Sequence, residues 1–227
     1  MAELIEGLQP ARVRANLEAV RAEIADAANR AGRDPREIEV CAATKYLPVG
    51  ELGALAEAGV TLVGENRAQD LEAKLAAHGD SFAWDFIGQL QSRKVKQIVP
   101  HVRVIHSLAS QSALAQLERH AGTARPGLEA LVEVNVSGEE GKAGIPPDAL
   151  AAFLARSPVG GVVTITGLMT MPPLAGDPEA SRPLFARLRE LAAAHDLARL
   201  SMGTTQDYPV AVEEGATIVR IGTRLYG

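Results

Sequence analysis

The chain has 227 residues, of which 47% are hydrophobic and 22% are charged, and its formal net charge at pH 7 is -5. This length and composition are ordinary for a globular protein with a full hydrophobic core. Because the balance is acidic and no run of five Lys and Arg residues occurs, the sequence argues against binding to nucleic acid or to an anionic membrane.

Cysteine content and the N-terminal residues indicate the cellular compartment. Cys41 is the single cysteine, which excludes an internal disulfide bond and is typical of a reducing cytoplasm. Residues 1–6 contain no basic stretch followed by an apolar run, as a secretory signal would, and no apolar segment approaches the length of a membrane span. We therefore expect a cytoplasmic protein without a membrane partner.

The first predicted element is a helix over residues 10–31. Its apolar residues, among them Val13, Leu17 and Val20, recur at steps of three and four and form one stripe. Gly32 follows at the point where the helix should end.

From there, short apolar segments typical of strands alternate with helical patterns. The predicted strands are 38–44, 61–63, 84–87, 102–106, 128–136, 162–167, 199–201 and 217–221. The predicted helices between and after them are 49–58, 67–78, 93–99, 110–120, 147–155, 178–195 and 208–214. Asp177 and Ser110 are expected N-caps, and Gly59 and Gly122 are expected to end helices in a left-handed conformation.

Eight strands alternating with helices imply right-handed crossovers and a parallel sheet. An open, doubly wound sheet also fits, but eight evenly spaced units favour a closed (β/α)8 TIM barrel with an extra N-terminal helix. The chain is short for such a barrel, so its loops must be short. We expect residues 1–227 to form a single domain.

In a parallel barrel the carboxyl ends of the strands face the active site, which draws attention to Lys45 after the first strand. In a dry pocket, burial lowers the pKa of such an amine and leaves a neutral nucleophile able to form an imine. We expect this amine to be kept dry at the mouth of the barrel. The alternative is a lysine that leaves a strand for water, as most lysines do.

Two glycine-bearing segments follow the last two strands, 201–205 and 220–223. Each offers hydroxyl groups and a glycine that lets backbone amides approach a ligand, and the loops after strands seven and eight commonly bind phosphate in this fold. The alternative is that these glycines only permit tight turns.

A phosphate site beside an amine indicates a phosphorylated carbonyl compound. Two classes remain: a sugar-phosphate aldolase, or a protein that holds pyridoxal 5′-phosphate as a Schiff base. Arg220 bears on this choice, because an inward-pointing arginine could face a ring nitrogen and keep it largely unprotonated. The cofactor would then be a weak electron sink.

Other candidate sites are weaker. The five histidines show no metal-binding spacing, so no metal is expected, and no glycine-rich nucleotide motif occurs. Ser107 beside His106 suggests a nucleophile and base, but the sequence names no carboxylate to orient the histidine. The basic cluster 93–96 is typical of a solvated helix face, with contact to an acidic partner as the alternative.

Motifs along nearly the whole chain carry a family resemblance. They are ATK at 43–45, GEN at 64–66, WDFIGQLQS at 84–92, NVS at 135–137, KAGI at 142–145, GLMTM at 167–171, LSMG at 200–203 and VRIGT at 219–223. In these the chain resembles the pyridoxal-phosphate homeostasis proteins, relatives of the N-terminal barrel of alanine racemase. The resemblance implies fold type III of pyridoxal-phosphate proteins and pyridoxal 5′-phosphate as the cofactor.

The resemblance also implies residue roles. Lys45 would carry the cofactor as a Schiff base, Arg220 would face the pyridine nitrogen, and Lys142 would be a second handle on cofactor or ligand. The phosphate would be held by Thr205, Gly222 and Thr223, and the ring lined by Asn66 and Met202. The full predicted set of cofactor-binding residues is Lys45, Asn66, Ser201, Met202, Gly203, Thr205, Arg220, Gly222 and Thr223.

The chain departs from the family pattern at three places. Thr204-Thr205 stands where Met-Ser is common, which puts the packing around Thr204 in doubt although Thr205 keeps a hydroxyl. Asp85 stands where histidine is common, and Arg93 where asparagine is common. These two changes put the role of that loop in question.

The function implied by the resemblance is that of a carrier or regulator of pyridoxal 5′-phosphate supply, without robust turnover. Racemisation needs acid/base groups on both faces of the substrate carbon, and neither Tyr46 nor Tyr208 can be assigned to the face opposite Lys45. A racemase of low activity and, further off, a Schiff-base aldolase remain as alternatives. The expected partners are the cofactor and apo-enzymes that receive it, and the expected state is a monomer or weak dimer.

Overall fold

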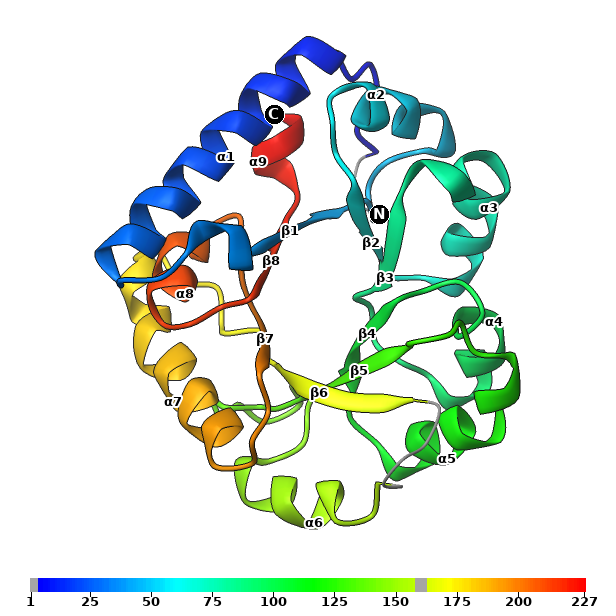
Figure 1. Ribbon diagram of the computed structural model, residues 1–227, viewed down its shortest axis with the longest axis vertical. Helices are drawn as coiled ribbons and strands as arrows, with labels where there is room; N and C mark the ends of the chain where they lie inside the picture. The colour runs from blue at the N-terminus through cyan, green and yellow to red at the C-terminus, as the bar shows by residue number, and fades with distance from the viewer. Residues whose placement is uncertain (1–3, 158–162) are drawn as a thin grey trace.

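The computed structural model describes residues 4–157 and 163–227. Eight strands form one closed barrel in chain order, and β8 closes it by pairing with β1 (Figure 1). The strands are β1 (Glu39–Ala43), β2 (Leu62–Glu65), β3 (Ala83–Phe86), β4 (Val104–Leu108), β5 (Glu129–Glu133), β6 (Thr164–Met169), β7 (Arg199–Thr204) and β8 (Ile218–Ile221). Every pairing is parallel. The predicted barrel is confirmed, and the open sheet is wrong.

The helices lie outside the barrel (Figure 1). They are α1 (Pro10–Arg30), α2 (Leu52–Glu57), α3 (Ala68–His78), α4 (Val95–Ile98), α5 (Gln111–Arg119), α6 (Leu150–Leu154), α7 (Arg182–Ala193), α8 (Tyr208–Glu213) and α9 (Thr223–Tyr226). The extra helix α1 packs against α8 and α9 with its apolar stripe. Four predicted helices begin as 3-10 turns, and α9 was not predicted because four residues show no periodicity.

Most of the predicted punctuation is present. The side chain of Asp177 accepts a hydrogen bond from the backbone N–H of Glu179, and that of Ser110 accepts one from Ala113. Gly59 has a φ of 87°, as expected for the end of a helix. The prediction for Gly122 is wrong, because this residue lies in a 3-10 turn without a positive φ. In the predicted strand 162–167, residue 162 lies outside the described residues.

Two apolar layers hold the barrel together. The larger one fills the space between the strands and the surrounding helices. The smaller one lies inside the barrel and consists of Cys41, Leu62, Val104, Leu131, Met169 and Ile218. The interior is not wholly apolar, because β3, β4, β7 and β8 also contribute the buried polar side chains of Asp85, His106, Ser201 and Arg220. Within the described ranges, no helix has the length and apolar character needed to cross a membrane.

Candidate functional site

A cavity of about 430 Å³ opens at the carboxyl ends of the strands. Its lining includes Lys45, Asn66, Thr205, Arg220, Gly222 and Thr223. These residues come from the ends of β1, β2, β7 and β8, which are far apart in the sequence but meet at one edge of a parallel barrel. The structure therefore brings most of the predicted site residues together.

Three predicted residues of β7 do not line this cavity. Successive side chains of a strand point to opposite faces. The Ser201 hydroxyl lies inside the barrel against Arg220, and the fully buried Met202 therefore points outward, into the layer under the helices. The expectation that Met202 contacts a bound ring is not met. Gly203 has a φ of 88° and packs so closely on α8 that a Cβ would lie 2.5 Å from the Cβ of Ala211.

Lys45 lies at the cavity with both glycine segments, but its side chain is exposed. The expectation of a dry amine is therefore wrong for this structure. The ammonium sits 4.7 Å from the centre of the Tyr46 ring, within the range of a cation–π contact. The amine is thus accessible to a ligand entering the cavity, and an aromatic face restricts where it lies.

A buried ion pair between Glu65 and Lys74 fixes the backbone at the ends of the neighbouring strands β1 and β2, beside the cavity. The Glu65 carboxylate accepts hydrogen bonds from the Thr44 hydroxyl at 2.9 Å and from the backbone N–H of Asn66 at 2.7 Å. The Lys74 ammonium contacts the same carboxylate and donates to the Thr44 carbonyl at 2.8 Å. One pair therefore holds the residue before Lys45 and the backbone of Asn66.

The side chain of Asn66 offers an unused acceptor. Its Oδ1 is buried and has no hydrogen-bond partner within the described part of the chain. A buried polar atom left unpaired costs about 1–3 kcal/mol. This cost makes Asn66 a candidate contact for a polar group of a ligand.

Gly88 permits the close approach of the segment after β3 to the backbone of Asn66. A Cβ at this position would lie 2.0 Å from the Asn66 carbonyl oxygen. We expect Gly88→Ala to lower the free energy of unfolding by about 3 kcal/mol or more, because backbone must move. We also expect weaker ligand binding at the cavity, because Asn66 moves with it. Urea denaturation measures the first effect; Gly53→Ala, in α2 with open space around the new methyl group, is the matched control and should not destabilise.

Arg220 presents a buried cation to the same cavity. It donates from Nη1 to the Ser201 carbonyl at 2.9 Å and to the Ser201 hydroxyl, and from Nη2 to the Thr170 carbonyl at 3.1 Å. Burial lowers the pKa of this guanidinium below its ordinary value, but an arginine remains charged in proteins. A guanidinium has five N–H donors. The others find no acceptor among residues 4–157 and 163–227, which leaves them for a ligand.

Two of the predicted phosphate contacts lie next to each other. The Gly222 N–H donates to the Thr205 hydroxyl at 3.2 Å.

Two apolar residues on the connection after β6, Met171 and Leu174, also line the cavity. They are 51% and 80% exposed. Sequence reasoning missed both, because their exposure is seen only in the structure. Lys142 does not line the cavity and pairs instead with Glu139 at 2.9 Å.

The hypothesis of a Ser107 nucleophile is wrong. The Ser107 hydroxyl donates to the Gly88 carbonyl. His106 turns instead to Asp85, with Nε2 3.1 Å from a carboxylate oxygen, and to the Ser201 hydroxyl, 2.8 Å from Nδ1. The side chains of His106, Asp85 and Ser201 are all fully buried.

The buried histidine predicts a pH dependence of stability. Burial lowers the pKa of His106 below its ordinary value, although its hydrogen bond to Asp85 opposes this. The unfolded chain therefore takes up this proton first as the pH falls below about 6.5, and the fold loses stability there. We expect the free energy of unfolding of the wild type to fall more steeply between about pH 7 and pH 5 than that of His106→Gln. Parallel slopes in urea titrations would contradict this expectation.

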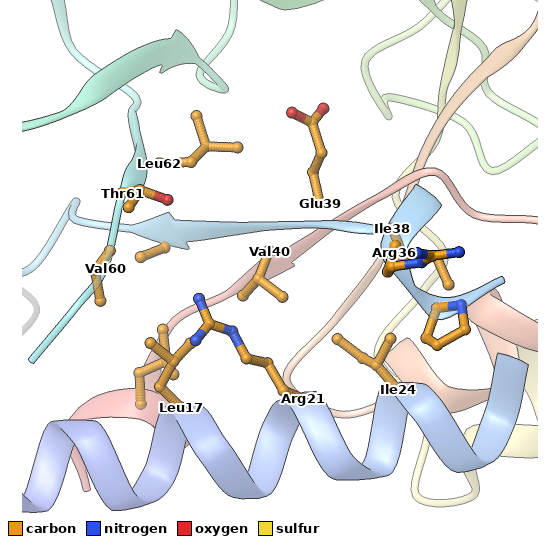
Figure 2. A pocket seen from close by; sticks show the side chains of 13 residues that line it. Leu17, Arg21, Ile24, Arg36, Ile38, Glu39, Val40, Val60, Thr61 and Leu62 are labelled. Carbon is orange, nitrogen blue, oxygen red and sulfur yellow. The ribbon is translucent and has the colours of Figure 1, made fainter.

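A second cavity, of about 410 Å³, lies at the other end of β1 and β2, beneath α1 (Figure 2). Its walls are mostly aliphatic, with Leu17 and Ile24 from α1 facing Val40 from β1. Glu39 projects from the opposite side of the same strand. This cavity is at the amino ends of the strands, where catalytic residues are not expected in a barrel, and no lysine is among the described residues that line it.

Comparisons with known proteins agree with this architecture. The sequence model of the family described as "Alanine racemase, N-terminal domain" matches residues 15–227. A pyridoxal phosphate homeostasis protein of Aquifex aeolicus is 38% identical, covering 93% of this chain and 96% of that protein. Another of Pseudomonas aeruginosa is 36% identical, covering 93% of this chain and 94% of that protein.

Solved structures give the same result. PipY of Synechococcus elongatus, in a structure with PLP bound, has a TM-score of 0.81 and 32% identity, covering 95% of this chain and 100% of that one. Alanine racemase of Bartonella henselae has a TM-score of 0.73 at 13% identity and covers 100% of this chain but 61% of its own, a likeness of fold. The barrel and these matches together show that the chain belongs to the alanine racemase N-terminal domain family, in its branch of pyridoxal phosphate homeostasis proteins.

Proposed function

We propose that this protein binds pyridoxal 5′-phosphate as a Schiff base on Lys45 and serves intracellular homeostasis of this cofactor. The observation that carries the proposal is the cavity itself, which unites an accessible amine, a glycine and hydroxyl segment, and a buried arginine with spare N–H donors. Its relatives named pyridoxal phosphate homeostasis protein, and PipY with PLP bound, support the same cofactor.

The residues present fit this cofactor. Thr205, Gly222 and Thr223 offer hydroxyl and backbone N–H groups to its phosphate, as the last two loops of such barrels commonly do. Arg220 would offer N–H donors to the pyridine nitrogen, and Asn66 Oδ1 would accept from a polar ring substituent. When bound, the cofactor would supply an electrophilic aldehyde, and the Lys45 amine would be the group that holds it covalently.

The surroundings of the cavity support a carrier rather than a racemase. A racemase needs a second acid/base group facing the lysine. The Tyr208 hydroxyl bonds Glu23 on α1, outside the barrel, and the Tyr226 hydroxyl donates to the Ala43 carbonyl at 3.1 Å. Tyr46 is next to Lys45 in sequence and contacts its ammonium, so it is on the same side. Arg220 also disfavours protonation of the ring nitrogen, which weakens the cofactor as an electron sink.

The wider proposal follows from this role. We propose a cytoplasmic carrier formed by one barrel domain, residues 1–227, acting as a monomer or weak dimer. Apo-enzymes that use pyridoxal 5′-phosphate would receive the cofactor from it.

The test is the visible spectrum and the intact mass after borohydride reduction. A carrier is expected to be yellow, to gain the mass of one reduced cofactor and to activate an apo-enzyme, without exchanging the α-hydrogen of alanine in deuterated water. Such exchange would indicate a racemase. A colourless protein that borohydride modifies only with an added sugar phosphate would indicate an aldolase and overturn the proposal.

A further inference from the structure

Behind Arg220, a row of buried hydrogen bonds crosses the barrel. Arg220 donates to the Ser201 hydroxyl, which contacts Nδ1 of His106 at 2.8 Å. Nε2 of the same histidine contacts Asp85 at 3.1 Å. Asp85 in turn accepts from Nε and Nη2 of Arg103 at 2.9 Å and 3.1 Å. The row joins the candidate ligand cavity to the middle of the barrel through four strands.

Each proton in this row can be assigned from its partners. Both carboxyl oxygens of Asp85 accept from N–H groups of Arg103, so Asp85 is the acceptor toward His106 as well, and His106 carries a proton on Nε2. Arg220 can only donate, so the Ser201 oxygen accepts from it. With a neutral imidazole, Nδ1 is an acceptor and the Ser201 hydroxyl donates its own proton to it.

The charges around His106 favour this neutral form. The cations Arg103 and Arg220 lie on either side of it, and Asp85 is the one carboxylate that it contacts within the described residues. Cys41 also faces this part of the barrel interior, and burial raises the pKa of its thiol, so it adds no charge. A second proton on His106 would make Nδ1 a donor to the Ser201 oxygen, which already accepts from Arg220, and the Ser201 hydroxyl proton would lose Nδ1 as its acceptor.

A hydrolytic triad does not explain these residues. Serine, histidine and aspartate are present, but all three side chains are completely buried, so no substrate reaches the hydroxyl. The Ser201 hydroxyl oxygen also accepts a hydrogen bond from the Arg220 guanidinium. This bond would not favour attack of the hydroxyl on a carbonyl carbon. At the cavity end of the row, Arg220 has spare donors.

We propose that His106 is a positioning residue for Arg220. Held as the Nε2–H tautomer by Asp85, His106 accepts a hydrogen bond from the Ser201 hydroxyl at Nδ1 and so directs a lone pair of the serine oxygen at the guanidinium. This fixes the plane of Arg220 and the direction of its remaining N–H groups at the cavity. The effect on the cofactor rests on the proposed function, whereas the tautomer does not.

The tautomer is tested without cofactor, by nitrogen NMR of the apo-protein with ¹⁵N-labelled histidine. The His106 signals are assigned as those that are lost in the His106→Gln variant. We expect a protonated Nε2 and an unprotonated Nδ1, unchanged from about pH 8 to pH 6. A protonated Nδ1 at pH 7, as the other tautomer or as imidazolium, would overturn the proposal.

The effect on Arg220 is tested with pyridoxal 5′-phosphate and four variants. Ser201→Ala and His106→Leu should weaken binding about tenfold, the size expected for one misdirected hydrogen bond from a charged donor. Both should also shift the absorption band of the bound cofactor and its pH profile. His106→Gln keeps one donor and one acceptor, so its cofactor affinity and the absorption of its bound cofactor should stay close to those of the wild type. His101→Leu, at an exposed histidine, is the matched control and should match the wild type.

The outcomes separate the two ideas. If Ser201→Ala unfolds at the wild-type temperature yet binds the cofactor with unchanged affinity and spectrum, the positioning role is wrong. If the wild type binds no pyridoxal 5′-phosphate, the proposed function fails, and the NMR result alone decides whether His106 orients Ser201 and Arg220.

Discussion

Lys45→Ala is expected to abolish covalent attachment of pyridoxal 5′-phosphate, so that borohydride adds no cofactor mass and the visible band is lost. The reason is positional: Lys45 is the lysine that lines the cavity among the described residues. Lys74 is buried in an ion pair with Glu65, and Lys142 is paired with Glu139 away from the cavity. Intact mass before and after reduction, with peptide mapping, measures the result.

Two controls sharpen this experiment. Lys142→Ala should retain the band and the added mass. Lys45→Arg keeps the positive charge, but its protonated guanidinium does not form a Schiff base with the aldehyde of the cofactor. This variant should therefore bind the cofactor reversibly at most. If Lys45→Ala stays coloured and borohydride still fixes the cofactor, another lysine is the anchor, and Lys142 is the first to examine.

The periodicity of the sequence predicts the barrel well because the fold depends on local signals. Each strand of this barrel is a short apolar run between helical patterns, and closure follows from their number. The residues just after the strands are also predictable as a group, since parallel strands all end at one edge. For this reason the strand pattern alone is enough to place Lys45, Asn66 and Thr223 together.

The rest could not be predicted because it depends on pairing between side chains of different strands. Asp85 looked like an unexplained departure from the family pattern, and only the barrel brings it to His106 and Arg103. Likewise, β7 was predicted three residues too short, which hid the alternation that turns Met202 away from the cavity. The exposure of Lys45 depends on how the loops around it pack, which no local pattern determines.

Lys74 was missed for a different reason. It lies at helical spacing from Ala68 and Leu71, on the buried face of α3. A lysine at such a position is a signal that it pairs with a buried acid. Glu65 at the end of β2 was the available partner, and the sequence contained both residues.

Lys74→Met is expected to destabilise the fold by about 3–5 kcal/mol, because it leaves the Glu65 carboxylate buried and without its cation. Removing both charges, in Glu65→Leu with Lys74→Met, should cost less than Lys74→Met alone, since no unpaired charge remains. Lys142→Met breaks the more exposed pair with Glu139 and should change stability by less than about 1 kcal/mol. Urea denaturation of the four proteins gives these values.

This ion pair also has a consequence at the cavity. Glu65 and Lys74 together hold the Thr44 hydroxyl and carbonyl and the Asn66 backbone, so the folded fraction of Lys74→Met should bind pyridoxal 5′-phosphate more weakly than the wild type. The double variant should recover stability but not affinity, because leucine and methionine cannot make those hydrogen bonds. Recovery of both together would mean that the pair contributes to packing alone and does not position the residues beside Lys45.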